Sequence, residues 1–251
     1  MTKVTINCDM GEAFGIYRFG DDETCMPFVT HANIACGFHA SDPSVMWHTV
    51  RAAKKHGLKI GSHPGLPDRE GFGRREMKLT REEVAALVLY QTGALQAFAR
   101  AEDVALSHIK PHGALFGMAQ RDEPIAEGIA DAALTLGLPV IAYSDCAMSE
   151  VFTRRGVEFT CEFYADLDYD DHGRQFITKE HRPVAPDAAA AKAWRRHRGA
   201  DHLGQRQGRQ GCRRFHLRAF RYAGRNGGRK SRPRRAAAYA LSWPRGAHQD
   251  W

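Results

Sequence analysis

The stretch HANIACGFHASDPSVMWHTVRAAKKHGLKIGSHPG, residues 31–65, decides the fold, because two short apolar runs flank one helical segment. The runs at 31–39 and 58–65 are typical of strands. The segment between them, 41–57, predicts a helix, since it begins with a Ser-Asp-Pro sequence suited to a helix N-terminus and ends at Gly57. Strand, helix and strand in this order indicate two parallel strands joined by a crossover helix.

The same alternation extends over the first 190 residues. Its clearest helix, 79–104, opens with the capping box Thr80-x-x-Glu83. Repeated strand–helix units imply an α/β fold with a parallel sheet and helices outside it. The remaining predicted elements are strands at 3–9, 138–144 and 157–166, a strand with a loop at 105–115, and helices at 121–136 and 145–155.

Polar and ionisable side chains recur where the predicted strands end. In parallel α/β folds, and above all in barrels, the carboxyl ends of the strands form the ligand site. Any one of these residues alone is more often a hydrogen-bonded structural residue, but their recurrence at five strand ends favours an active site. The residues are Asn7, Asp9, His39, His63, Lys110, His112, Glu162 and Asp166.

Two glycine-containing motifs follow the first two strands. In NCDMGEAFG, the carboxylates of Asp9 and Glu12 could serve as general base, as metal ligand or as partner of a histidine, and a tight turn with a helix cap is the alternative. In NIACGFHASDP, His39 stands three residues before Asp42, a spacing that can bind a divalent ion. We favour Asp42 as the cap of the following helix, and we assign no metal ligands from the sequence.

Two further motifs supply cationic side chains. In HIKPHGALF, Lys110 and His112 alternate onto one face of an extended segment. Lysine suits the binding of a negatively charged oxygen, and histidine suits proton transfer near neutral pH. In SHPGLPDREGFGRRE, Arg74 and Arg75 can meet a carboxylate or phosphate, although a solvated loop is the alternative. Neither common glycine-rich phosphate-binding motif occurs, so ATP, if used, is held in another way.

These motifs together resemble the LamB/YcsF family. The five matching segments are NCDMGEAFG, NIACGFHASDP, SHPGLPDREGFGRR, HIKPHGALF and EFYADLDYDDHGR, which run in order across about residues 3–185. The resemblance implies a (β/α) barrel related to the glycoside hydrolase/deacetylase-like barrels. It also implies the A subunit of an enzyme that, with partner subunits B and C, uses ATP to open the lactam 5-oxo-L-proline to L-glutamate.

With this resemblance, the candidate residues divide into three roles. Proton transfer falls to His39 with Asp9 or Glu12, and stabilisation of an oxyanion or phosphate falls to Lys110 and His112. The sixth catalytic candidate, His63, positions the substrate together with the substrate-binding candidates Asn7, Asn33, Arg74, Glu162 and Asp166.

ATP is then the co-substrate, with a divalent cation such as Mg²⁺ as a possible companion. The alternative within enzymes is a metal-dependent amide or carbohydrate hydrolase or deacetylase on a related barrel. A metal bound at Asp9, His39 and His63 would favour that alternative, and ATP dependence would count against it.

The chain also departs from the family pattern. Ser41 stands where the family usually has glycine, and Leu167 stands where it usually has arginine. The family's closing motif, close to Ser-Ile-Cys-Val-His-Ser-Asp-Thr-Pro, is missing. Without the strand that this motif would supply, we expect a barrel that is incomplete at its C-terminus, with unpaired strand edges.

Charge is unevenly distributed along the chain. Residues 191–251, the basic segment, hold 17 of the 36 Lys and Arg residues but only two of the 29 acids, whereas residues 1–190 are net acidic. One interpretation is an arm that binds nucleic acid, since arginines with aromatic residues can contact phosphates and stack on bases. Another is a solvated, disordered tail. No apolar run is long enough to span a membrane and no signal-peptide pattern opens the chain, so we expect a cytoplasmic protein.

A third interpretation of the basic segment is a change of reading frame. The residues FHLRAFRYAG, 215–224, can be encoded so that reading one nucleotide later yields Ser-Ile-Cys-Val-His-Ser-Asp-Thr-Pro, the missing motif, without a conflict. We therefore expect the chain to leave its ancestral frame between about Ala191 and Gly199. On this interpretation, residues 1–190 form the barrel domain, and residues 191–251 are a disordered or non-native tail with no specific nucleic-acid partner.

Overall fold

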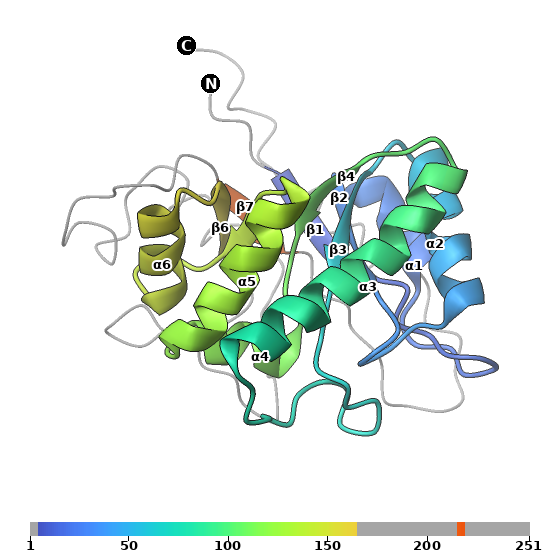
Figure 1. Ribbon diagram of the computed structural model, residues 1–251. Helices are drawn as coiled ribbons and strands as arrows, with labels where there is room; N and C mark the ends of the chain where they lie inside the picture. The colour runs from blue at the N-terminus through green and yellow to red at the C-terminus, as the bar shows by residue number, and fades with distance from the viewer. Residues whose placement is uncertain (1–4, 165–214, 219–251) are drawn as a thin grey trace, which may run out of the picture.

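In the computed structural model of the protein, which describes residues 5–164 and 215–218, parallel strands form a barrel with helices on its outside (Figure 1). The strands follow one another around the barrel in chain order, which confirms the expected (β/α) barrel. They are β1 (Thr5–Met10), β2 (His31–Ala35), β3 (Lys59–His63), β4 (Leu106–Ile109), β5 (Val140–Ala142), β6 (Phe159–Phe163) and β7 (Phe215–Arg218). The helices are α1 (Asp22–Cys25), the 3-10 helix η1 (Met26–Phe28), α2 (Pro43–Lys55), α3 (Arg81–Ala101), α4 (Gly113–Ala119), α5 (Glu123–Leu136) and α6 (Ala147–Arg155).

The helix caps predicted from the sequence are confirmed at the starts of α2 and α3. Asp42 caps α2 by accepting hydrogen bonds from the backbone of Ser44 and Val45, so its carboxylate is a cap rather than a metal ligand. Thr80 and Glu83 form the reciprocal capping box at the start of α3.

Strand register brings the candidate residues to one end of the barrel. Asp9 of β1 lies opposite Asn33 of β2, and Ala35 at the end of β2 lies opposite His63 at the end of β3. Because all the pairings are parallel, the loops after these strands emerge on the same side. The side chains singled out at strand ends therefore face a common region.

The hydrophobic core lies between the sheet and the outer helices. One buried cluster joins β4–β6 to α3–α6, and a second joins β1–β3 to α2. Helices α3 and α5 pack side by side in this layer (Figure 1). The described residues contain no helix that is both long and apolar enough to cross a membrane.

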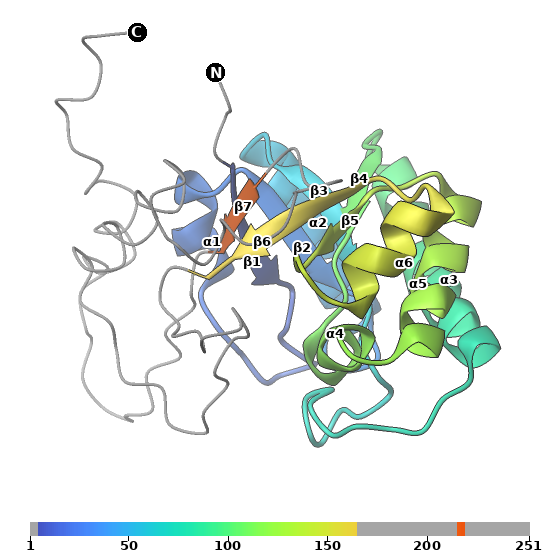
Figure 2. The same cartoon turned by 90° about the vertical axis from the view of Figure 1, so that its left-hand side faces the viewer.

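The barrel differs in one respect from the open sheet that we expected. Strand β7 pairs in parallel with both β6 and β1 and closes the barrel (Figure 2). The physical reason for this closure is that the edge strands β6 and β1 expose backbone N–H and C=O groups. An extended segment of almost any sequence can form hydrogen bonds with those groups. Residues 165–214 and 219–251 lie outside the described part of the chain, and so do the Leu167 departure and most of the basic segment.

Candidate active site

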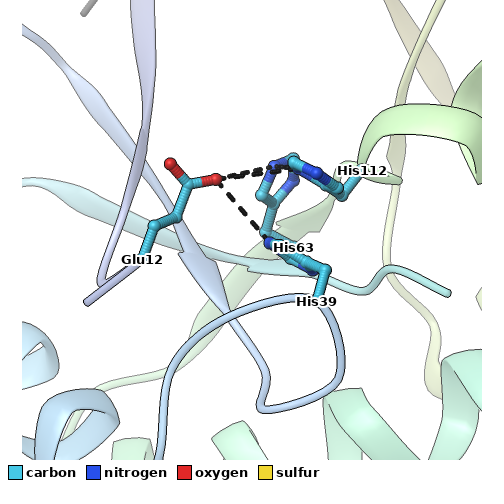
Figure 3. A group of neighbouring side chains, drawn as sticks. All are labelled: Glu12, His39, His63 and His112. Atoms are coloured by element: carbon cyan, nitrogen blue, oxygen red, sulfur yellow. Dashed lines mark hydrogen bonds and ion pairs between the residues drawn. The ribbon is translucent and has the colours of Figure 1, made fainter. Parts of the chain in front are cut away.

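Four side chains from successive strand ends converge at the carboxyl end of the barrel. Glu12 follows β1, His39 follows β2, His63 ends β3, and His112 immediately precedes α4. All four are buried, and one donor atom of each lies within 4.8 Å of those of the others (Figure 3). We call these four residues the histidine cluster, and it could hold a metal ion.

Specific contacts orient the rings of the histidine cluster. His63 Nδ1 lies 2.6 Å from the Lys110 carbonyl oxygen, and His112 Nε2 lies 2.8 Å from the Phe72 carbonyl oxygen. His63 Nε2 and His112 Nδ1 face each other at 3.0 Å. His39 stacks parallel on His112, with ring centroids 3.6 Å apart. The rings are therefore held by main-chain acceptors and by one another.

A second group surrounds Lys110, whose side chain is only 1% exposed. Its ammonium lies 2.9 Å from Asp9 Oδ1 and 3.1 Å from Glu162 Oε1. Asn7 donates a hydrogen bond to Glu162 Oε1, and Asn33 donates to Asp9 Oδ1. We call Lys110, Asp9, Glu162, Asn7 and Asn33 the lysine network. It places one cation between two buried carboxylates, an arrangement that compensates buried charge.

The two groups touch through Asp9. Its Oδ2 lies 3.4 Å from His63 Nε2, while its Oδ1 contacts Lys110. The structure therefore gathers nine of the eleven candidate residues into one continuous buried site.

The other two candidates, Arg74 and Asp166, are not among these buried residues. Arg74 is exposed, and its guanidinium lies over the Phe72 ring at 5.5 Å from the centroid. Phe72 borders the site, since its carbonyl accepts a hydrogen bond from His112, so Arg74 lies beside the site and not within it. Asp166 lies beyond the described residues. Arg75, the neighbouring arginine, pairs with the buried carboxylate of Asp68 and so stabilises the loop.

Sequence reasoning missed His108. Its Nε2 lies 2.7 Å from Asn33 Oδ1, so this ring contacts the lysine network through Asn33. The alternation of His108, Lys110 and His112 along an extended segment was the signal that could have identified it. Gly61 makes room for the ring, because a Cβ there would lie 2.1 Å from His108 Nε2.

Burial sets the protonation of several groups. It lowers the pKa of His39, with Glu12 only partly opposing the effect, and it lowers the pKa of His112 well below 6.5. Both rings are therefore neutral near pH 7 and can accept protons or bind a cation. Burial also raises the pKa of the nearby Cys36 thiol to about 12, which excludes it as a thiolate nucleophile.

The fold and site together define an enzyme-type β/α barrel with a buried ionisable centre at the carboxyl ends of its strands. The sequence pattern of the LamB/YcsF family matches residues 4–204. The chain belongs to the LamB/YcsF family.

Individual relatives agree with this membership. The chain is 47% identical over 184 residues to the lactam utilization protein lamB of Emericella nidulans, covering 73% of this chain and 72% of that protein. It is 45% identical over 191 residues to the 5-oxoprolinase A subunit of Staphylococcus carnosus, covering 75% and 76%. The crystal structure of the lactam utilization protein from Thermus thermophilus superposes with a TM-score of 0.81 at 36% identity, covering 95% of this chain and 94% of that one.

Proposed function

We propose that this chain is the A subunit of a 5-oxoprolinase, a hydrolase that opens the lactam ring of 5-oxo-L-proline to give L-glutamate. ATP is the co-substrate, and subunits B and C are the partners. The observation that carries the proposal is the buried site of carboxylates, imidazoles and one lysine at the carboxyl ends of the strands. Relatives that align with about three quarters of the chain are named as A subunits of 5-oxoprolinase, which supports it.

The chemistry explains why ATP is needed. A lactam is a stabilised amide, so water attacks its carbonyl carbon slowly. Transfer of the ATP γ-phosphoryl group to the lactam oxygen makes that carbon electrophilic. Addition of water and cleavage of the C–N bond give an acyl phosphate, and a second water releases phosphate and L-glutamate. These steps require proton transfer, cationic stabilisation of negative oxygen and binding of the substrate carboxylate.

The residues can meet these requirements as follows. His39 is neutral near pH 7 and lies 3.6 Å from Glu12, which suits the pair to accept a proton from water, with Asp9 as the alternative carboxylate. Lys110 stabilises the negative oxygen or phosphate, and His112, whose Nε2 already donates to the Phe72 carbonyl, does so once its Nδ1 has taken up a proton. Because Lys110 already contacts two carboxylates, its ammonium is held in place before any ligand binds.

The substrate-binding assignments rest on position. His63 lies at the junction of the two groups, and the exposed Arg74, over the Phe72 ring beside the site, can direct its guanidinium to the substrate carboxylate. Glu162 Oε2 is buried and has no hydrogen-bond partner in the described structure, so it can accept a hydrogen bond from the lactam N–H. Asn7 and Asn33 orient that end of the site, and Asp166 completes the proposed set.

The test is reconstitution of the chain, with its reading frame restored after about residue 191, with subunits B and C, and glutamate release is measured in the presence and absence of ATP and Mg²⁺. Lys110→Ala and His112→Ala should each reduce turnover to background, since each removes a group that stabilises developing charge. His48→Ala, which changes an exposed histidine of α2, should leave turnover unchanged. Circular dichroism would check that each variant folds. Near wild-type rates in the Lys110 and His112 variants, or turnover without ATP, would contradict the proposal.

A further inference from the structure

The histidine cluster contains a pair of nitrogens that its own hydrogen bonds leave unsatisfied. A carbonyl oxygen only accepts, so His63 Nδ1 must donate to the Lys110 carbonyl and His112 Nε2 must donate to the Phe72 carbonyl. In neutral rings, the remaining nitrogens then both carry lone pairs. These are His63 Nε2 and His112 Nδ1, which face each other at 3.0 Å. Two lone pairs at this distance repel unless a cation or a proton lies between them.

His39 adds a second, independent observation. Its residue is 1% exposed, and neither ring nitrogen has a hydrogen bond in the described structure. Its Nε2 lies 3.6 Å from Glu12 Oε1, which is longer than a normal hydrogen bond. A buried imidazole without a hydrogen bond is costly. Figure 3 shows its ring directed toward the same region as Glu12 and the other two rings.

The donor spacing fits one ion. Glu12 Oε1 lies 3.6 Å from His39 Nε2, 3.7 Å from His112 Nδ1 and 4.0 Å from His63 Nε2. Ligands at the zinc–nitrogen distance of about 2.0–2.1 Å define a tetrahedron with edges of about 3.4 Å. Four of the six separations, from 3.0 to 4.0 Å, bracket that edge, and one donor atom of each residue lies within 4.8 Å of the others. Because His39 stacks parallel on His112, its ring must tilt out of that stack before all four donors can bind a single cation.

Donor type and the surrounding contacts select the class of ion. Three imidazoles and one carboxylate suit zinc and its first-row neighbours, whereas Mg²⁺ prefers oxygen ligands and keeps several waters. Two rings already donate their second nitrogen to main-chain carbonyls, the outer-shell arrangement that orients histidine ligands in metal sites. We propose that this chain binds a zinc-class divalent ion through Glu12, His39, His63 and His112, separate from any Mg²⁺ that accompanies ATP. With that ion bound, Asp9, the alternative carboxylate, would be the proton acceptor in place of the His39–Glu12 pair.

The experiment measures metal in the full chain alone, without substrate, ATP or partner subunits. The protein is dialysed with equimolar Zn²⁺, Mn²⁺, Co²⁺ and Mg²⁺, gel-filtered and analysed by mass spectrometry for bound metal. We expect about one transition ion per chain and no retained Mg²⁺. Bound Co²⁺ should also give a visible absorption band, and removing the ion with EDTA should lower the melting temperature, because a ligand of the native state stabilises it.

Matched variants locate the ion. His39→Asn should weaken binding by more than the roughly 10–100-fold that loss of an outer-shell partner costs. His48→Asn makes the same change at an exposed histidine and should bind metal as wild type does. Should His39→Asn fail to fold, Glu12→Gln with Co²⁺ absorption provides the second comparison.

Three results would overturn the proposal. They are a folded wild-type chain without bound transition metal, retention of Mg²⁺ alone, and unchanged affinity in the cluster variants. A metal-free chain in which a proton bridges His63 and His112 would give the first result. This test measures metal binding and no turnover, so its result does not depend on whether the chain is a lactam hydrolase. ATP dependence would still distinguish the 5-oxoprolinase from a metal-dependent amide or carbohydrate hydrolase.

Discussion

Ser41 combines an unfavourable backbone conformation with complete burial. Its φ is 76°, in the left-handed region that disfavours residues with a Cβ, and it is 0% exposed. The backbone hydrogen bonds at this position do not need the side chain: Ser41 N donates to Ala13, and its carbonyl accepts from Arg69. The glycine usual in the family would therefore fit here with less strain.

We expect Ser41→Gly to raise the free energy of unfolding by about 0.5–1 kcal/mol, since relief of the left-handed strain exceeds the extra entropy of a glycine in the unfolded chain. Urea unfolding followed by circular dichroism measures this. Ser44→Gly, the same change in the first turn of α2, should instead destabilise by about 0.5–1 kcal/mol. A loss of stability in Ser41→Gly would show that the buried hydroxymethyl group matters more than the strain.

The sequence predicted which residues lie at the site, but it did not predict which of their atoms are in contact. The end of each strand identified Asp9, His63 and Lys110 as members of one site, because parallel strands align their carboxyl ends. Which atoms meet depends on rotamers and register, which no spacing encodes. The sequence therefore did not predict that Lys110 lies between two carboxylates, or that His63 and His112 face each other.

At the scale of elements, the long periodic helices were predicted, whereas the short helices α1 and α4 were not. Helix α3 was expected at 79–104 and spans Arg81–Ala101, because its capping box and apolar period agree. Helix α4, only seven residues long, was expected to be loop. Its sequence follows a proline and begins with glycine, so local propensity is against a helix; packing of its buried Leu115 and Phe116 stabilises it instead.

Glu127 of α5 joins the outer helices through charge. It contacts Arg154 at 2.6 Å and also pairs with Arg155, both on α6, and it lies 3.4 Å from Arg81 on α3. Its side chain is 11% exposed, whereas that of Glu123, which shares Arg154, is 58% exposed. Lower solvent screening makes the Glu127 pairs the stronger ones.

Glu127→Gln should therefore lower the free energy of unfolding by about 1–2 kcal/mol, because it removes a largely buried carboxylate that pairs with three arginines, of which Arg155 is itself part-buried. Glu123→Gln should cost less than half as much. Urea titrations at low and high salt measure the loss of unfolding free energy in each variant. The difference between the two losses should decrease only slightly as salt is added. Equal losses in the two variants would mean that burial does not strengthen this network.

At the scale of the whole molecule, the position of β7 bears on the basic segment. Residues 215–218 lie between β6 and β1, and their codons read one nucleotide later admit Ser-Ile-Cys-Val, the strand of the missing motif. The His and Asp of that motif would follow the strand, at the same end of the barrel as the histidine cluster. We propose that the chain leaves its ancestral frame between about residues 191 and 199, so that residues 1–190 form the ancestral barrel domain.

Restoring the frame should therefore restore catalytic groups. A gene corrected by one nucleotide between codons 191 and 199, so that the closing motif replaces residues 215–223, should support glutamate release with subunits B and C. We expect turnover at least roughly 10²-fold above that of the present chain, the lower contribution of one positioned acid or base. The corrected chain carrying Lys110→Ala is the control and should stay at background. Equal turnover of the corrected and present chains would contradict the proposed change of reading frame. So would an intact mass, measured on protein made from the native gene, that matches the present sequence in a fully active enzyme.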